Sequence, residues 1–248
     1  MNRRRRLGQH LLVDSNVLNA ILDSAKLGKD EVVYEIGTGN GILTAELCTR
    51  AGSVISCDVD KDMITATKGI LGKYDNLTLL HADGFKFDVT FDVFVSNLPY
   101  SKSRRALEWL ASRKFNRAVV MVQKEFAMKI LSNSGSNYRA VSALAQHCFD
   151  MEIIMNVNRN SFNPKPRVDS ILLKIVQKRR IDNDVIKALK FLFSYRGKKV
   201  SSVARKFKIR DINNIDIDKR IEQLTPSEAI GLATMIEQKQ KQLLQTVR

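Results

Sequence analysis

Short runs of β-branched and apolar residues alternate with helix-like segments through the first half of this 248-residue chain. We expect strands at Val32–Ile36, Ser53–Asp58, Leu77–His81, Phe91–Ser96 and Arg117–Val122. The segments between them, such as Ile42–Ala51 and Lys61–Leu71, carry apolar residues at helical spacing. Strands that alternate with helices form a parallel sheet with helices on both faces. The pattern therefore predicts a doubly wound α/β unit of the Rossmann-like type.

The pattern changes after this sheet-forming region. Tyr138–Phe149 is expected to form a helix, and strand-like runs at Met151–Val157 and Ile171–Val176 can end the sheet as a hairpin. Charged helical segments follow from residue 178 onward, and Thr225 is a typical cap for a last helix. We therefore expect an α/β domain over residues 1–177 and a small all-helical domain over residues 178–248.

Basic residues outnumber acidic ones, with 41 Lys and Arg against 26 Asp and Glu, which gives a net charge of +15 and a pI near 9.9. Such a charge attracts polyanions, so nucleic acid is the expected partner. A basic composition that serves only solubility is the alternative at this point.

Targeting and metal-binding signals are weak. No run approaches the roughly 20 apolar residues that cross a bilayer, and the apolar run after Arg3–Arg6 is too short for a signal peptide. The three cysteines are far apart and are not at metal-ligand spacing with the histidines. We expect a cytoplasmic protein without a membrane partner, with reduced core thiols and no metal site.

A glycine-rich turn, Gly37-Thr38-Gly39-Asn40-Gly41, follows the first expected strand. Glycines let the backbone turn sharply there and approach a ligand closely. Asp58 ends the second strand about 20 residues after the first glycine, where a carboxylate can accept hydrogen bonds from both hydroxyls of a ribose. The combination predicts adenosine binding, and a turn without a ligand is the alternative.

Dinucleotides and S-adenosylmethionine both contain adenosine, so other residues must separate them. Glu35 stands two residues before the first glycine, and the glycine spacing lacks the third glycine of the pyrophosphate fingerprint. Asp83 follows the third strand, where its carboxylate can accept from the adenine amine. These features favour S-adenosylmethionine as the cofactor.

The fourth strand ends in Asn97-Leu98-Pro99-Tyr100. The adenine amine is a poor nucleophile because its lone pair is delocalised, and the Asn97 side-chain oxygen and the Leu98 carbonyl can hold its two hydrogens. Pro99 fixes the direction of that carbonyl, and Tyr100 offers a face on which a base stacks for roughly 1–3 kcal/mol. The motif predicts methyl transfer to an exocyclic amine by alignment, without a tuned general base. An Asn-Pro turn that only ends a strand is the alternative.

With these motifs the chain resembles the ribosomal RNA adenine dimethyltransferase family over nearly its whole length. That family puts two methyls on each of two adjacent adenosines near the 3′ end of small-subunit rRNA. The resemblance implies a class I methyltransferase sheet, the cofactor S-adenosylmethionine, and a substrate within an immature ribosomal subunit. It implies cofactor contacts from Gln9, His10, Leu12, Glu35, Gly37, Gly39, Asp58, Val59, Asp83, Gly84 and Asn97.

Further segments carry the same resemblance. Phe162, in the late loop Phe162–Ser170, would cover the target base on the face opposite Tyr100, and Arg196, Lys198 and Lys199 would contact RNA. The chain departs from the family pattern in having leucine at 11, threonine in place of proline at 38, aspartate in place of glutamate at 58, and glycine in place of a second arginine at 197. A solvated helix face is the alternative for the basic segment.

Three rival functions share some of these features. A large-subunit rRNA methyltransferase that confers antibiotic resistance has the same cofactor loop and amine motif, but the late loop and the tail favour the small-subunit enzyme. DNA adenine methyltransferases usually have a different amine motif. A non-catalytic assembly or transcription factor would bind RNA through its charge alone. A monomer is expected because no heptad pattern is legible.

Overall fold

The computed structural model describes residues 10–133, 135–209, 212 and 215–246. Within these residues the chain packs into two compact units. The first unit contains the residues up to 127 together with 150–177, and the second contains residues 128–149 together with those from 178 onward.

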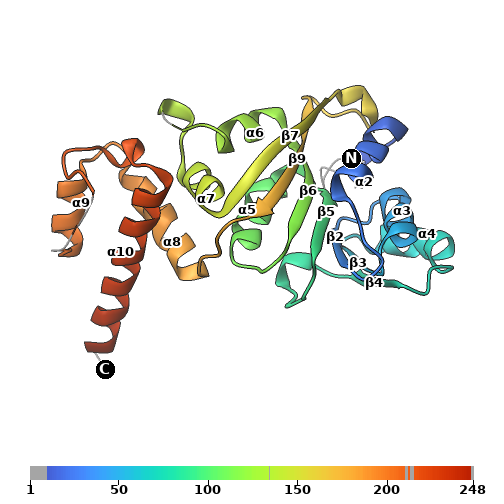
Figure 1. Cartoon of the computed structure of the whole chain (residues 1–248), viewed down its shortest axis with the longest axis horizontal. Helices are drawn as coiled ribbons and strands as arrows, with labels where there is room; N and C mark the ends of the chain where they lie inside the picture. Colours follow the sequence, from blue (N-terminus) through green and yellow to red (C-terminus); the bar gives the residue numbers. More distant parts are fainter. Residues whose placement is uncertain (1–9, 134, 210–211, 213–214, 247–248) are drawn as a thin grey trace. The chain divides into compact units, whose positions relative to one another are not determined.

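The first unit is built on a seven-stranded sheet with the order β4-β3-β2-β5-β6-β9-β7 (Figure 1). Neighbouring strands from β4 to β6 are parallel, and β9 runs antiparallel to β6. The bounds are β2 Val32–Ile36, β3 Ser53–Asp58, β4 Leu77–His81, β5 Val93–Asn97, β6 Arg117–Gln123, β7 Phe149–Val157 and β9 Ser170–Gln177. The expected strands are confirmed, and the expected hairpin does end the sheet as β9 and β7.

One strand begins later than expected. Strand β5 starts at Val93 rather than Phe91, and its pairing with β2 begins at Val33 and Val93. Just before this pair, the Val32 amide donates to the Asp92 carboxylate at 2.9 Å, so a side chain takes the place of a backbone acceptor there. Strand β5 also includes Asn97, so the first residue of the amine motif is the last residue of this strand.

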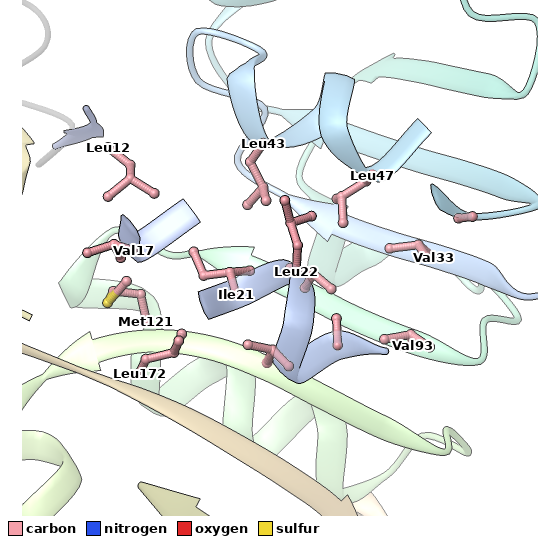
Figure 2. Close-up of a cluster of buried hydrophobic side chains, with 14 of the residues drawn as sticks. Leu12, Val17, Ile21, Leu22, Val33, Leu43, Leu47, Val93, Met121 and Leu172 are labelled. Atoms are coloured by element: carbon pink, nitrogen blue, oxygen red, sulfur yellow. The ribbon is translucent and has the colours of Figure 1, made fainter. Parts of the chain in front are cut away.

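Helices cover both faces of this sheet. On one face, α2 (Ser15–Ala25) and α3 (Ile42–Arg50) pack their apolar residues on the strands. Figure 2 shows Ile21 and Leu22 of α2 beside Leu43 and Leu47 of α3. On the opposite face, Trp109 of α5 (Ser103–Ala111) contacts the Tyr34 and Phe94 rings. The remaining helices of this region are α4 (Lys61–Leu71) and α6 (Lys124–Ile130). The predicted α/β class is confirmed.

A second, two-stranded sheet was not expected from the sequence. Strand β1 (Leu11–Leu12) pairs antiparallel with β8 (Phe162–Asn163), which joins segments about 150 residues apart in the chain. Asp14 follows β1 and caps α2, accepting from the Asn16 amide at 3.0 Å and from the Ser161 hydroxyl at 2.8 Å. We call residues 10–14 the N-terminal strap.

The second unit is helical, with α7 (Ala140–Cys148), α8 (Asn183–Leu192), α9 (Val200–Phe207) and α10 (Pro226–Thr246). Helix α7 packs on α8 and α10, because nearly all of its residues are small or apolar and buried. Residues 128–149 therefore group with the C-terminal segment, whereas the sequence pattern placed them before a boundary at residue 177. The division into domains 1–177 and 178–248 stays a prediction.

Helix α10 has 21 residues, but its sequence includes four charged residues and four glutamines. Across the described parts of the chain, no helix combines the length and the apolar character that crossing a membrane requires.

Candidate active site

A cavity lies at the carboxyl ends of β2, β3 and β5 and is bordered by the N-terminal strap. Ligands of open α/β sheets bind at this edge. The cavity brings together most of the residues that the sequence singled out for the cofactor: His10, Leu12, Glu35, Gly37, Gly39, Asp58, Val59, Asp83, Gly84 and Asn97. Leu98, Pro99 and Tyr100 line it as well. Gln9 lies outside the described residues.

The glycine turn folds tightly against the exit of β3. Gly37, Gly39 and Gly41 all have positive φ, at 96°, 55° and 79°, a conformation that costs other residues free energy. The Gly37 amide donates to the Cys57 carbonyl at 2.7 Å, and the Gly39 amide donates to the Asp58 carboxylate at 3.1 Å. The turn therefore presents bare backbone to the cavity.

Asp58 is almost completely buried at the end of β3. Its carboxylate accepts from the amides of Gly39 and Asp60, the latter at 2.8 Å. Burial raises the pKa of this carboxyl group, although the two amides favour its charged form. Each oxygen keeps a second lone pair for a ligand, so Asp58 can both anchor the glycine turn and accept from a hydroxyl in the cavity.

Glu35 is fully buried on β2 and is tied into a chain of hydroxyl groups. Its Oε2 atom accepts from Thr44 and from Ser56, each at 2.6 Å. The Ser56 hydroxyl in turn accepts from the Thr38 hydroxyl at 2.7 Å. Burial raises the pKa of Glu35 to about 7, against the opposing effect of the Ser56 and Thr44 hydrogen bonds.

The other oxygen of Glu35, Oε1, differs from Oε2. Oε1 is buried without a hydrogen bond from any described residue, and Glu35 lines the cavity. A buried acceptor without a donor costs roughly 1–3 kcal/mol, and a cationic ligand group would relieve that cost. The sequence pointed to Glu35 but not to its hydroxyl partners; the threonine at 38, where the family usually has proline, was the available signal.

Asp83 is held from two sides at the start of the 3₁₀ turn Gly84–Lys86. Its carboxylate accepts from the Phe85 amide at 3.2 Å and from Arg105 at 3.0 Å, while the Arg105 guanidinium also lies over the Phe85 ring. Sequence reasoning missed Arg105, because nothing along the chain connects α5 with the turn after β4. Asp83 would share its carboxylate between Arg105 and a ligand.

Gly84 has a packing role. A side-chain carbon at this position would lie 2.3 Å from the Cys57 sulfur and 2.9 Å from the Tyr34 hydroxyl, which is far inside van der Waals contact. The Tyr34 hydroxyl also donates to the Gly84 carbonyl at 2.7 Å. Only glycine fits here, and the turn that carries Asp83 is fixed to the sheet.

The amine motif is oriented by the N-terminal strap. The Asn97 side-chain amide donates through Nδ2 to the His10 carbonyl at 3.1 Å. This bond leaves Oδ1, the acceptor, available to a substrate. Pro99 adopts an extended backbone with φ −53° and ψ 129°, as a rigid carrier of the Leu98 carbonyl should.

Tyr100 is fixed by two neighbours. Its hydroxyl shares a 2.6 Å hydrogen bond with the Ser170 hydroxyl, and its ring lies 5.5 Å from the His10 ring, centroid to centroid. His10 donates from Nδ1 to the Pro164 carbonyl at 2.7 Å. The strap, the amine motif and the late loop therefore meet around Tyr100.

Phe162 occupies a different place from the other candidate residues. Its side chain is 3% exposed and belongs to the hydrophobic cluster with Leu12 and Leu172, and it is not among the residues that line the cavity. The expected role of Phe162 over the target base stays a prediction.

The three expected RNA contacts lie in the second unit on an exposed basic segment. Arg196 lies 3.9 Å from the Glu222 carboxylate, and Lys199 lies 2.9 Å from that of Asp218. Among the described residues, Lys198 forms no ion pair with an acidic side chain. Their RNA-binding role stays a prediction. In the described part of the chain, no group of three or more His, Cys, Asp and Glu side chains is placed to hold a metal ion.

Comparison with known proteins decides the family. The family model for ribosomal RNA adenine dimethylase matches residues 1–241. The chain belongs to the ribosomal RNA adenine dimethylase family. As a member of that family it is an rRNA adenine methyltransferase, and the class I methyltransferase fold agrees with this assignment.

Two curated relatives are similar to this protein over most of its length. The probable ribosomal RNA small subunit methyltransferase A of Pyrococcus abyssi is 34% identical over 240 residues, which are 90% of this chain and 88% of that protein. The ribosomal RNA small subunit methyltransferase A of Thermotoga neapolitana is 34% identical over 235 residues, covering 92% of this chain and 90% of that protein.

Solved structures agree with the fold of the dimethylase family member. A dimethyladenosine transferase from Plasmodium falciparum superposes with a TM-score of 0.77 and 28% identity, over 93% of this chain and 98% of that one. The 23S rRNA methyltransferase ErmE has a TM-score of 0.67 and 21% identity, over 92% and 99% of the two chains. The latter likeness shows the shared fold alone.

Proposed function

We propose that this protein transfers methyl groups from S-adenosylmethionine to the exocyclic amines of two adjacent adenosines near the 3′ end of small-subunit rRNA. The names of the curated relatives, small subunit methyltransferases in both cases, support the choice of subunit. The substrate is the rRNA of an immature ribosomal subunit, and the place of action is the cytoplasm. One chain suffices, because the cofactor side and the adenine side of the cavity come from a single unit.

The orientation of Asn97 carries this proposal. The His10 carbonyl takes the Nδ2 hydrogen, so Oδ1 is left to accept a hydrogen from the adenine amine. With the Leu98 carbonyl as second acceptor, both amine hydrogens are held, and the lone pair of the nitrogen is directed toward the methyl donor. The remaining contribution is alignment of the reacting atoms, for which Tyr100 supplies a fixed stacking surface.

The residues of the cavity fit S-adenosylmethionine. When bound, the cofactor supplies an electrophilic methyl group on a sulfonium. Glu35 Oε1, a buried acceptor with no donor in the described part of the chain, would bind the ammonium of the methionyl part. Asp58 would accept from the ribose hydroxyls, and Asp83 from the adenine amine. The glycine turn provides room for close backbone contact.

The experiment replaces the acceptor of the amine. We expect Asn97→Ala to lower methyl transfer at least about 100-fold, the usual cost of removing one hydrogen-bonding group that acts on the transition state. Transfer is measured with radiolabelled S-adenosylmethionine, and the RNA is digested to identify dimethyladenosine. Binding of S-adenosylhomocysteine, measured by calorimetry, should stay within a few-fold of the wild type.

Asn156→Ala, which removes an exposed asparagine on β7, is the matched control and should methylate at the wild-type rate. If Asn97→Ala turns over as fast as this control, Asn97 does not hold the amine.

A further inference from the structure

Three aromatic side chains gather on the surface of the second unit, and the proposed function does not use them. Phe191 on α8 lies 5.5 Å from both Tyr195 and Phe207, and these two lie 6.3 Å apart, all between ring centroids. The planes are inclined by 78° to 80°, so the rings meet edge to face. We call these three residues the aromatic platform.

The platform is not a part of the buried core. The Phe191 side chain is 40% exposed, and Tyr195 and Phe207 are half-buried. Phe193, two residues from Phe191, shows the contrast, because it is buried and packs against Tyr138. This unit thus buries the Phe193 ring in its core and leaves a separate group of three rings partly in contact with water. Apolar side chains that gather in one surface patch, rather than singly, indicate an interaction site.

The charge around the platform indicates the chemistry of that partner. Residues 190–208 contain no Asp or Glu, and the segment from 196 contributes Arg196, Lys198, Lys199, Arg205, Lys206 and Lys208. Lys206 places its ammonium 4.8 Å from the centre of the Tyr195 ring. Within the described residues, Arg205, Lys206 and Lys208 have no ion pair with an acidic side chain, which leaves their charge available to an anion.

We propose that the aromatic platform stacks unpaired bases of the rRNA substrate while Lys206 and Arg205 bind the flanking phosphates. Exposed aromatic rings beside unpaired cations form the usual surface for single-stranded RNA, because every base has a π face and every nucleotide a phosphate. Phe191, the most exposed ring, is the primary stacking surface. The inference rests on the proposed function for its substrate and extends it to a second contact in the C-terminal unit.

The test compares two RNAs of equal length, a hairpin with the loop sequence of the 3′ end of small-subunit rRNA and a fully paired duplex. We expect Phe191→Leu and Tyr195→Leu each to weaken binding of the hairpin by about 5- to 140-fold, the range expected for one lost stack. Duplex binding should change less than 2-fold. Lys206→Gln should instead reduce the slope of log affinity against log salt by about 0.7 to 0.9, one phosphate contact.

Matched controls are Phe87→Leu, an exposed aromatic of the first unit, and Lys68→Gln, an exposed lysine on α4. Both should bind hairpin and duplex like the wild type. Thermal melting of each variant confirms that it is folded, and Phe191→Leu, at an exposed position, keeps the test valid if Tyr195→Leu unfolds.

Wild-type affinity of folded Phe191→Leu for the hairpin would overturn the proposal. So would an equal loss on hairpin and duplex, or a loss seen only on assembled subunits and not on naked RNA, which would indicate a protein partner. A different result would contradict the proposed function. If the wild-type protein binds the hairpin through the platform but forms no dimethyladenosine in the subunit, the proposed activity is wrong and the proposed role of the platform still stands.

Discussion

Glu35 is fully buried, and its Oε2 atom accepts from two hydroxyl groups while Oε1 has no donor among the described residues. Burial disfavours the charged form, so the pKa of the carboxyl group rises to about 7. In the absence of a ligand the side chain therefore changes charge near neutral pH. The cofactor's ammonium, placed at Oε1, would supply the charge partner that the protein does not.

This arrangement makes the stability of the free protein depend on pH in a defined direction. The pKa of Glu35 is higher in the folded chain than its ordinary value of 4.5, so the folded state binds more protons between these two values. The free energy of unfolding then falls as pH rises through that window, by on the order of 3 kcal/mol in total. Below about pH 4.5 the group contributes no penalty.

Glu35→Gln should remove that dependence, because glutamine cannot ionise but its oxygen can still accept from Thr44 and Ser56. We expect the melting temperature of the variant relative to the wild type to increase between pH 5 and pH 8, measured by calorimetry without ligand. A difference that stays constant over this range would show that Glu35 does not titrate there.

Asp58 has both a structural and a ligand-binding role, and these can be separated. Asp58→Ala should weaken binding of S-adenosylhomocysteine by about 1.5–3 kcal/mol, the usual value for hydrogen bonds to a charged group. Asp58→Asn keeps one acceptor for the Gly39 amide, so it should be folded like the wild type and bind with intermediate affinity. Calorimetry showing wild-type affinity for Asp58→Ala would move the ribose site elsewhere.

At the residue scale, the sequence was sufficient to identify site residues that belong to a local motif at the end of a strand. The glycine turn, Asp58 and Asn97 line the cavity as expected, because each ends or follows a strand and parallel strands end at one edge. It could not identify Arg105 or the His10 carbonyl, since both reach the site through tertiary contacts. Phe162 packs in the hydrophobic cluster, and its expected role over the target base stays a prediction.

Among the elements, long buried strands were predictable from the sequence and the two-residue strands were not. Strand β2 is buried along nearly its full length, and a continuous apolar run of this kind is a strong signal. Strands β1 and β8 have two residues each, too few for any periodicity. These two strands are about 150 residues apart in the chain, so their pairing depends on the tertiary fold. The pairing places the N-terminal strap beside the cavity.

The N-terminal strap gives a prediction at this scale. Asp14→Ala removes the cap of α2 and the bond to the Ser161 hydroxyl, so we expect a loss of about 1–2 kcal/mol in the free energy of unfolding. Because the strap also orients Asn97 through His10, methyl transfer should fall with it. Asp14→Asn, which caps a helix equally well, should keep most of the stability and most of the transfer rate. Urea unfolding measures the first, and single-turnover assays measure the second.

The strap would have no part in orienting Asn97 if Asp14→Ala lost stability but kept the wild-type rate of transfer.

At the scale of the whole molecule, a basic chain combines an α/β unit that contains the candidate active site with a helical unit that carries basic and aromatic residues on its surface. The net charge of +15 favours association with rRNA and makes it dependent on salt. Composition alone indicated nucleic acid as the partner, without the kind of nucleic acid. The grouping of residues 128–149 with the C-terminal unit was not accessible, since α7 reads like any short apolar helix until its packing partners are known.

The most direct test of the central claim is to map the product on its natural substrate. The protein is incubated with S-adenosylmethionine and small ribosomal subunits that lack the modification, and the methylated positions are identified by mass spectrometry of rRNA fragments. The account predicts dimethyladenosine at two adjacent positions near the 3′ end of the small-subunit rRNA. Methylation of large-subunit rRNA alone, or cofactor binding without any methylated adenosine, would contradict it.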